Sequence, residues 1–108
     1  MNMLKTMPLG MVAIFYEEIA KKCELAASMS LAAALAGDLE AVERLSAQLG
    51  AHLRAMAICL RRLNRLEELK VVEEAITIND RDLAKMRQVS SLSKAVEKIN
   101  SYGSAAQS

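Results

Sequence analysis

The longest regular pattern of apolar positions lies in the middle of the chain, between Asp38 and Ile76. Apolar residues recur there in steps of three and four, the spacing that lines one face of an α-helix. The segment has no proline and one interior glycine, Gly50, so the pattern predicts one long helix over about residues 38–76. Such a helix is too long for a compact globule of this size, and predicts elongated packing beside its partners. Its apolar positions are Val42, Leu45, Leu49, Leu53, Met56, Leu60, Leu63, Leu66, Leu69, Val72 and Ile76.

A second helix is predicted before this one, over about residues 8–36, and residues 1–6 are expected to be frayed. Pro8 suits the first turn of a helix, because its missing N–H would have no partner there. Gly37 is expected to end the helix, and Asp38 to cap the next one by accepting hydrogen bonds from its free N–H groups. A glycine–aspartate junction makes a tight reversal, so we expect the two helices to lie antiparallel.

A third, amphipathic helix is predicted over about residues 80–100, followed by a flexible tail over residues 101–108 that carries Tyr102. Cap-forming residue types at Thr77, Asn79 and Asp80 interrupt the pattern, and the sequence leaves open whether the chain turns or kinks there. The predicted fold class is therefore all-α: one domain, an elongated antiparallel helical hairpin with a third amphipathic C-terminal helix. The apolar positions of this last helix are Leu83, Met86, Val89, Leu92, Val96 and Ile99.

Composition and charge exclude several classes of partner. Of 108 residues, 53% are hydrophobic and 3% aromatic, which suits helices packed side by side. With 14 basic and 13 acidic residues there is no electrostatic footprint for nucleic acid or for an anionic membrane surface. Pro8 and Gly10 interrupt the one short apolar run near the start, and no run approaches the roughly 20 residues of a membrane span. We therefore expect a cytoplasmic protein without a signal peptide or a membrane span.

The residues that carry chemistry are few. Cys23 and Cys59 lie on separate helical segments without metal-ligand spacing, so we expect buried free thiols and no metal or cofactor. The acidic pairs are sequence neighbours that point about 100° apart on a helix, which is poor geometry for acid–base catalysis. The sequence has no nucleophile elbow and no glycine-rich phosphate loop, so we expect no catalytic residue and no enzymatic activity.

His52, the only histidine, leaves one alternative open. Helical phosphotransfer domains present an exposed histidine that is usually followed by a lysine and a glycine. Here Leu53, Arg54 and Ala55 follow His52, which supplies a cation but no glycine, and the cation is displaced by one position. A histidine without a special role is the favoured interpretation.

The apolar face of the third helix allows two interpretations. It can be an ordinary core element of a three-helix bundle, or it can stay exposed and receive a helix of another protein, a role to which methionine-containing surfaces adapt well. The same face can also serve a homodimer, which would make the protein a self-associating structural or adaptor module. Composition alone does not decide between them.

Short motifs over about residues 31–103 resemble the flagellar export chaperones of the FlgN type. They are GDLEAVERL at Gly37–Leu45, the residues Asn79, Asp80 and Leu83, and SYG at Ser101–Gly103. In that family the first motif belongs to a helical hairpin, an asparagine opens the last helix, and a Tyr-Gly follows it. This chain departs from the family in its shorter length, its brief tail and its methionine-rich start.

The resemblance implies a function and site residues. It implies a cytosolic chaperone that binds the C-terminal helical segments of hook-associated junction proteins, prevents their premature assembly and delivers them to the flagellar type III export apparatus. Tyr102 is then the residue that docks on the export gate, and virulence-type secretion chaperones are a sister class with other clients. The client-binding residues implied are Leu83, Met86, Val89, Leu92, Val96 and Ile99.

Overall fold

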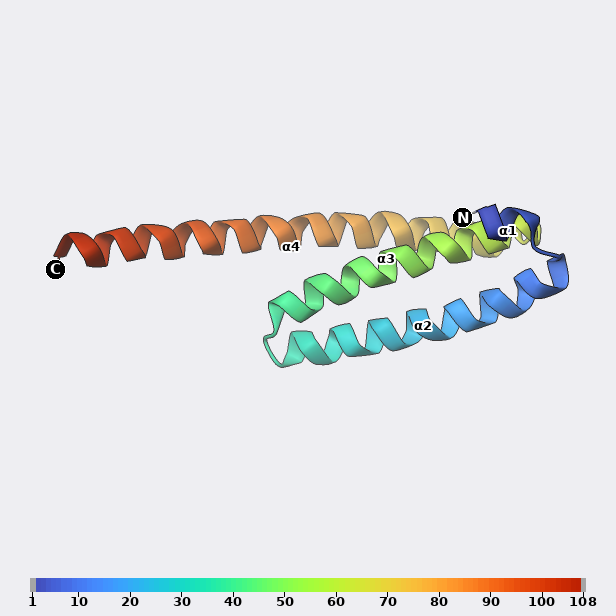
Figure 1. Ribbon diagram of the computed structural model, residues 1–108, viewed down its shortest axis with the longest axis horizontal. Coiled ribbons are helices and arrows are strands. Elements are labelled where there is room, and N and C mark those ends of the chain that lie inside the picture. The colour runs from blue at the N-terminus through green and yellow to red at the C-terminus, as the bar shows by residue number, and fades with distance from the viewer. Residues whose placement is uncertain (1, 108) are drawn as a thin grey trace.

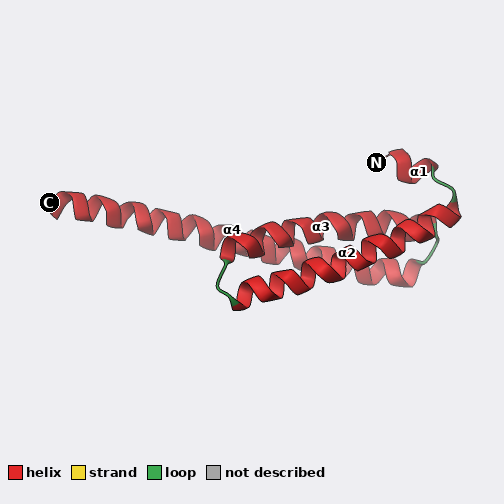
Figure 2. Cartoon of the chain, turned by 60° about the horizontal axis from the view of Figure 1, so that its bottom comes forward, coloured by secondary structure: helices red, strands yellow, loops and turns green. Residues whose placement is uncertain are grey.

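The computed structural model describes residues 2–107, which form four helices and no strand. The helices are α1 (Asn2–Thr6), α2 (Leu9–Leu35), α3 (Leu39–Arg62) and α4 (Leu66–Gln107). They pack into a rod of 68 × 23 × 22 Å, in which α2 and α3 form an antiparallel hairpin and α4 lies along α3 (Figures 1 and 2). This arrangement confirms the predicted fold class, whereas several of the predicted helix bounds are wrong.

The predicted reversal between the first two long helices is confirmed at Gly37 and Asp38. Gly37 has a positive φ of 76°, and its N–H donates to the Ala34 carbonyl at 3.1 Å. The Asp38 N–H donates to the Ala33 carbonyl at 2.9 Å, so the last carbonyls of α2 are satisfied in the pattern of a Schellman turn. The Asp38 carboxylate then accepts a hydrogen bond from the Ala41 N–H at 3.1 Å and caps α3.

The single helix predicted over residues 38–76 is wrong, because the chain reverses a second time at residues 63–65. Asn64 has a φ of 55°, and its N–H donates to the Arg61 carbonyl at 3.1 Å. The Arg65 N–H donates to the Leu60 carbonyl at 3.0 Å. These are the two hydrogen bonds of the turn at Gly37, with asparagine at the left-handed position that glycine usually takes. The turn lets α4 fold back along α3.

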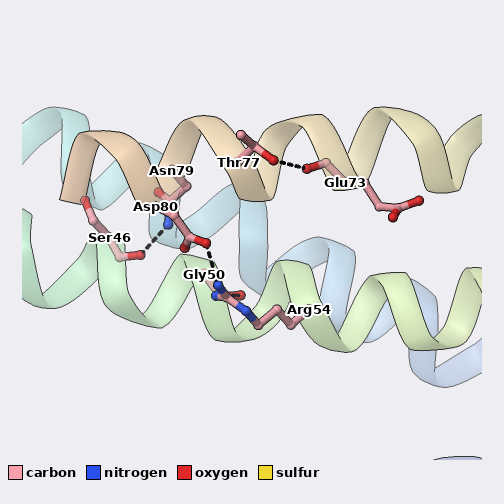
Figure 3. Close-up of polar contacts among 7 residues, drawn as sticks. All are labelled: Ser46, Gly50, Arg54, Glu73, Thr77, Asn79 and Asp80. Carbon is pink, nitrogen blue, oxygen red and sulfur yellow. Dashed lines mark hydrogen bonds and ion pairs between the residues drawn. The ribbon is translucent and has the colours of Figure 1, made fainter. Parts of the chain in front are cut away.

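The junction predicted at Thr77 to Asp80 is also wrong, since α4 runs through these residues without a turn (Figure 3). The Thr77 hydroxyl donates to the Glu73 carbonyl one turn earlier at 3.1 Å. The Asn79 and Asp80 side chains contact α3 instead of capping a helix. The predicted helix start at residue 80 is therefore wrong. So is the tail from residue 101, because α4 continues to Gln107; Ser108 lies outside the described residues.

The N-terminal segment, expected to be frayed, forms α1 and packs against the end of α3. Leu4 is buried in the core. The Arg62 guanidinium donates to the Leu4 carbonyl at 2.6 Å and to the Met7 carbonyl at 2.7 Å. These carbonyls have no partner inside such a short helix, so the arginine satisfies acceptors that helix ends leave free.

The hydrophobic core follows the second half of α3, which lies between α2 and α4. Cys59 and Leu60 are fully buried there. Cys23 and Cys59 are buried free thiols, and the Cys23 thiol donates to the Met56 sulfur at 3.3 Å. Burial raises the pKa of both thiols. The same cluster of buried residues includes Val12, Ile19, Leu53, Met56, Ala57, Leu69 and Val72.

Candidate partner-binding face of the projecting helix

The C-terminal part of α4 extends beyond the hairpin formed by α2 and α3 (Figure 1). α4 has 42 residues and α3 has 24, and both begin or end at the same turn. Their contact near the hairpin turn includes Arg87, whose guanidinium lies 3.4 Å from the Glu43 carboxylate. Every side chain from Ser91 to Tyr102 is exposed. The last described turns of α4 thus project from the hairpin as a single helix with exposed side chains.

A polar contact between α3 and α4 fixes the position from which α4 projects (Figure 3). The Asn79 amide donates to the Ser46 carbonyl at 2.9 Å, and Arg54 pairs with Asp80 at 2.6 Å. A Cβ atom at Gly50 would come within 3.1 Å of the Asn79 amide nitrogen, so the missing side chain permits this close approach. The sequence interpretation missed the contact, although an interior glycine in an otherwise strong helical pattern was the available signal.

The six residues expected to bind a client do not lie on one face. Leu83 is only 9% exposed and belongs to the α3–α4 interface, and Met86 is half-buried with its sulfur 3.9 Å from the Ser46 hydroxyl. Val89, Leu92, Val96 and Ile99 are 54% to 67% exposed. Tyr102 is exposed in the same way near the end of α4. We call Val89, Leu92, Val96 and Ile99 the distal face.

The helical geometry explains this division. Each residue turns an α-helix by about 100°, so a step of three residues falls about 60° short of a full turn. Leu83, Met86, Val89 and Leu92 follow one another in steps of three. Leu92 therefore lies on the side of α4 opposite to Leu83, and because Leu83 packs against α3, the distal face points away from the hairpin.

Between Val89 and Ile99 the charged side chains lie on the other side of α4. Lys94 and Arg87 line a shallow hollow beside the hairpin turn together with Glu40, Glu43 and Arg44. The distal face is bordered instead by small or uncharged side chains: Gln88, Ser93, Ala95 and Asn100. The projecting helix is therefore amphipathic, with an unpartnered apolar side.

Other candidate groups of the chain do not form a site. His52 is half-buried on α3 and is followed by the buried Leu53. In residues 2–107 no three or more His, Cys, Asp or Glu side chains are grouped so that they could hold a metal ion. The Arg65 guanidinium lies 5.2 Å from the centre of the Tyr16 ring, and burial, with the nearby charge of Glu68, raises the pKa of Tyr16. The contacts of Tyr16 with Arg65 and Glu68 join α2 to the start of α4, near the turn at residues 63–65.

None of the helices described has a stretch both apolar and long enough for a membrane crossing. No family model, curated protein or solved structure matches the chain.

Proposed function

We propose that the protein is a cytosolic export chaperone that binds the helical C-terminal segments of a hook-associated protein on the distal face. The observation that carries the proposal is the exposure of Val89, Leu92, Val96 and Ile99 on a helix that projects beyond its own hairpin. Contiguous apolar surfaces are uncommon on soluble proteins without partners. A client supplies the missing partner.

The shape of the distal face fits an amphipathic helix. An apolar stripe on a straight helix is complementary to a second helix that places its own apolar residues at i, i+3, i+4 and i+7 along it. Pairing of this kind covers the apolar residues by which the client would otherwise assemble too early. The covered client stays unpolymerised until the export apparatus receives it.

The sequence resemblance supports the flagellar form of this proposal at one end of the hairpin. Gly37 and Asp38 form the reversal that the family pattern places there. Asn79 departs from the pattern, because it lies inside α4 and does not open a helix, and Tyr102 lies within α4 and not after it. In the proposed chaperone, Tyr102 docks on the export gate through its exposed ring.

Calorimetric titration with the C-terminal segment of a hook-associated protein from the same genome tests the proposal. The expected result is one-to-one binding that Leu92→Asp and Val96→Asp each weaken at least ~10-fold, because each places a charge in an apolar contact. Leu25→Asp on α2 is the matched control, since Leu25 is 61% exposed and lies outside the distal face. If both α4 variants bind as tightly as the unmodified chain, the distal face is not the client site.

A second variant separates client binding from delivery. Tyr102→Ala is expected to leave the client affinity unchanged and to abolish recruitment of the chaperone–client complex to isolated export-gate protein. Recruitment that survives this substitution would contradict the docking role of Tyr102.

A further inference from the structure

We propose that two copies of this chain, without a client, pair through their distal faces as an antiparallel two-stranded coiled coil. Each copy then covers the apolar side of the other's projecting helix. The occupant of the distal face in the free protein is thus a second copy of the same chain.

The spacing of the distal face is that of a coiled-coil heptad. Val89 and Val96 are seven residues apart, and so are Leu92 and Ile99. They occupy the a and d positions of two consecutive heptads, with β-branched valine at a and leucine at the first d. Such a seam of a and d residues is the surface that a second helix covers in a coiled coil.

The residues beside the distal face favour a second copy over a partner selected by charge. At the e and g positions, where charges usually choose the partner, this chain has uncharged residues: Gln88, Ser93, Ala95, Asn100 and Tyr102. The charged Lys94, Glu97 and Lys98 occupy outer positions. Two identical helices therefore meet without like charges at the edges of their contact, and the surface is self-complementary.

The charged residues one heptad earlier, Asp82 and Lys85, determine whether the two helices run parallel or antiparallel. In a parallel pair in register, Asp82 and Lys85 would each face the same residue of the other copy, which places like charges together in the contact. In an antiparallel pair, Val89 lies opposite the partner's Ile99 and Leu92 lies opposite the partner's Val96. Lys85 then no longer faces the partner's Lys85. The two hairpins stay clear of the contact, because α3 packs on the other side of α4.

The pairing also regulates the proposed client site, and this step alone rests on the proposed function. The client and the second copy need the same four side chains, so they compete for them. The dimer keeps the chaperone's own apolar surface covered until a client arrives.

Analytical ultracentrifugation of the full chain without a client tests the pairing. The unmodified chain is expected to be a dimer that dissociates on dilution. Val96→Asp raises the dimer dissociation constant at least ~100-fold, because the charge enters the contact from both copies. Val71→Asp is the matched control: Val71 is 66% exposed on the same side of α4 but lies outside the antiparallel overlap, so this variant remains a dimer. Circular dichroism verifies that both variants keep their helix content.

Disulfide trapping tests the direction. Chains carrying Leu92→Cys are mixed with differently tagged chains carrying Val96→Cys and then oxidised. The expected product joins the two different chains, whereas Leu92→Cys alone gives no linked dimer. The unmodified chain is the control for Cys23 and Cys59, which are buried.

Three results overturn the inference: a monomeric unmodified chain, a Val96→Asp variant that dimerises as before, or Leu92→Cys linked mainly to itself. A monomer that still binds the client peptide rejects only the pairing. A dimer that binds no client rejects only the proposed function.

Discussion

Gly37 and Asn64 have the same position in two turns of the same kind. Both have positive φ, 76° and 55°, and in both turns the N–H of this residue and the N–H of the next residue donate to carbonyls of the helix that ends. The left-handed conformation costs an ordinary residue about 1–2 kcal/mol, whereas glycine has no Cβ to clash and asparagine tolerates the region better than most. Asn64 is therefore the residue that ends α3.

Substitution of Asn64 tests this role. Asn64→Ala is expected to lower the free energy of unfolding by about 1 kcal/mol, since alanine pays the full steric cost of the left-handed conformation. Asn64→Gly is expected to match or exceed the stability of the unmodified chain. Urea denaturation followed by circular dichroism measures both. Equal stability of the alanine and glycine variants would show that the backbone of Asn64 is not left-handed.

Because the thiols of Cys23 and Cys59 are buried, we expect the free energy of unfolding to fall at alkaline pH. Burial raises the pKa of Cys23 and Cys59 above the ordinary value of 9.0, so the folded chain holds these protons to higher pH than the unfolded chain. Their contribution to stability is fully present below about pH 9 and is lost as the pH rises further. Tyr16, whose pKa is raised above 10.0, acts in the same direction at still higher pH.

Urea titrations in steps from about pH 7 to 10 measure this dependence. The unfolding free energy of the unmodified chain is expected to fall above about pH 9, and that of the double variant Cys23→Ala, Cys59→Ala to fall less steeply. The double variant starts from a lower stability, because the smaller side chains leave cavities. If the unfolding free energy falls equally steeply with pH in both chains, the two thiols are not the cause of the alkaline loss of stability.

The helix predicted over residues 38–76 and the single apolar face predicted for Leu83 to Ile99 are both wrong for one physical reason. Leu60, Leu63, Leu66 and Leu69 follow in steps of three, as do Leu83, Met86, Val89 and Leu92. Repeated steps of three do not stay on one face of a helix, because each rotates by about 60° relative to the last. In the first run the chain resolves this with the turn at residues 63–65, and in the second a straight helix changes the side on which its apolar residues lie.

Features of the fold that have strong local causes can be predicted from the sequence alone. The all-α fold, the span of α2 and the reversal at Gly37 and Asp38 follow from periodicity and turn chemistry alone. The continuity of α4 through Asn79 and Asp80 does not, because it depends on contacts with Ser46 and Arg54 of another helix. The candidate site is predictable only in part, because it too depends on another helix. The sequence shows that its residues are apolar, but the position of α3 decides that Leu83 is buried and Leu92 is exposed.

A pair of proline variants tests the continuity of α4. Ile78→Pro, in the middle of the helix on an exposed position, is expected to cost about 3 kcal/mol or more, because it removes a backbone hydrogen bond and clashes with the preceding turn. Leu66→Pro is the matched control at the first residue of α4, where proline is tolerated. Thermal and urea unfolding measure both. Small and equal losses would show that the chain turns near Ile78 after all.

The whole molecule has a closed end and an open end. At the closed end α1 and the turn at Asn64 pack around the core that contains Leu60. At the open end α4 projects past the hairpin with the distal face uncovered (Figure 1). The polar contact of Asn79 with Ser46 holds the two ends in a fixed relation. This asymmetry is the reason that partner binding is assigned to the open end.

The measurement that tests this account most directly is methyl NMR spectroscopy of the full chain during titration with the client segment. The account predicts that the methyl signals of Val89, Leu92, Val96 and Ile99 shift on binding, while those of the buried Val12 and Leu60 do not. The same distal methyl signals are expected to shift when the free protein is diluted, as the paired copies separate. Shifts confined to exposed leucines of α2, such as Leu25, with no change on the distal face, would contradict the central claim.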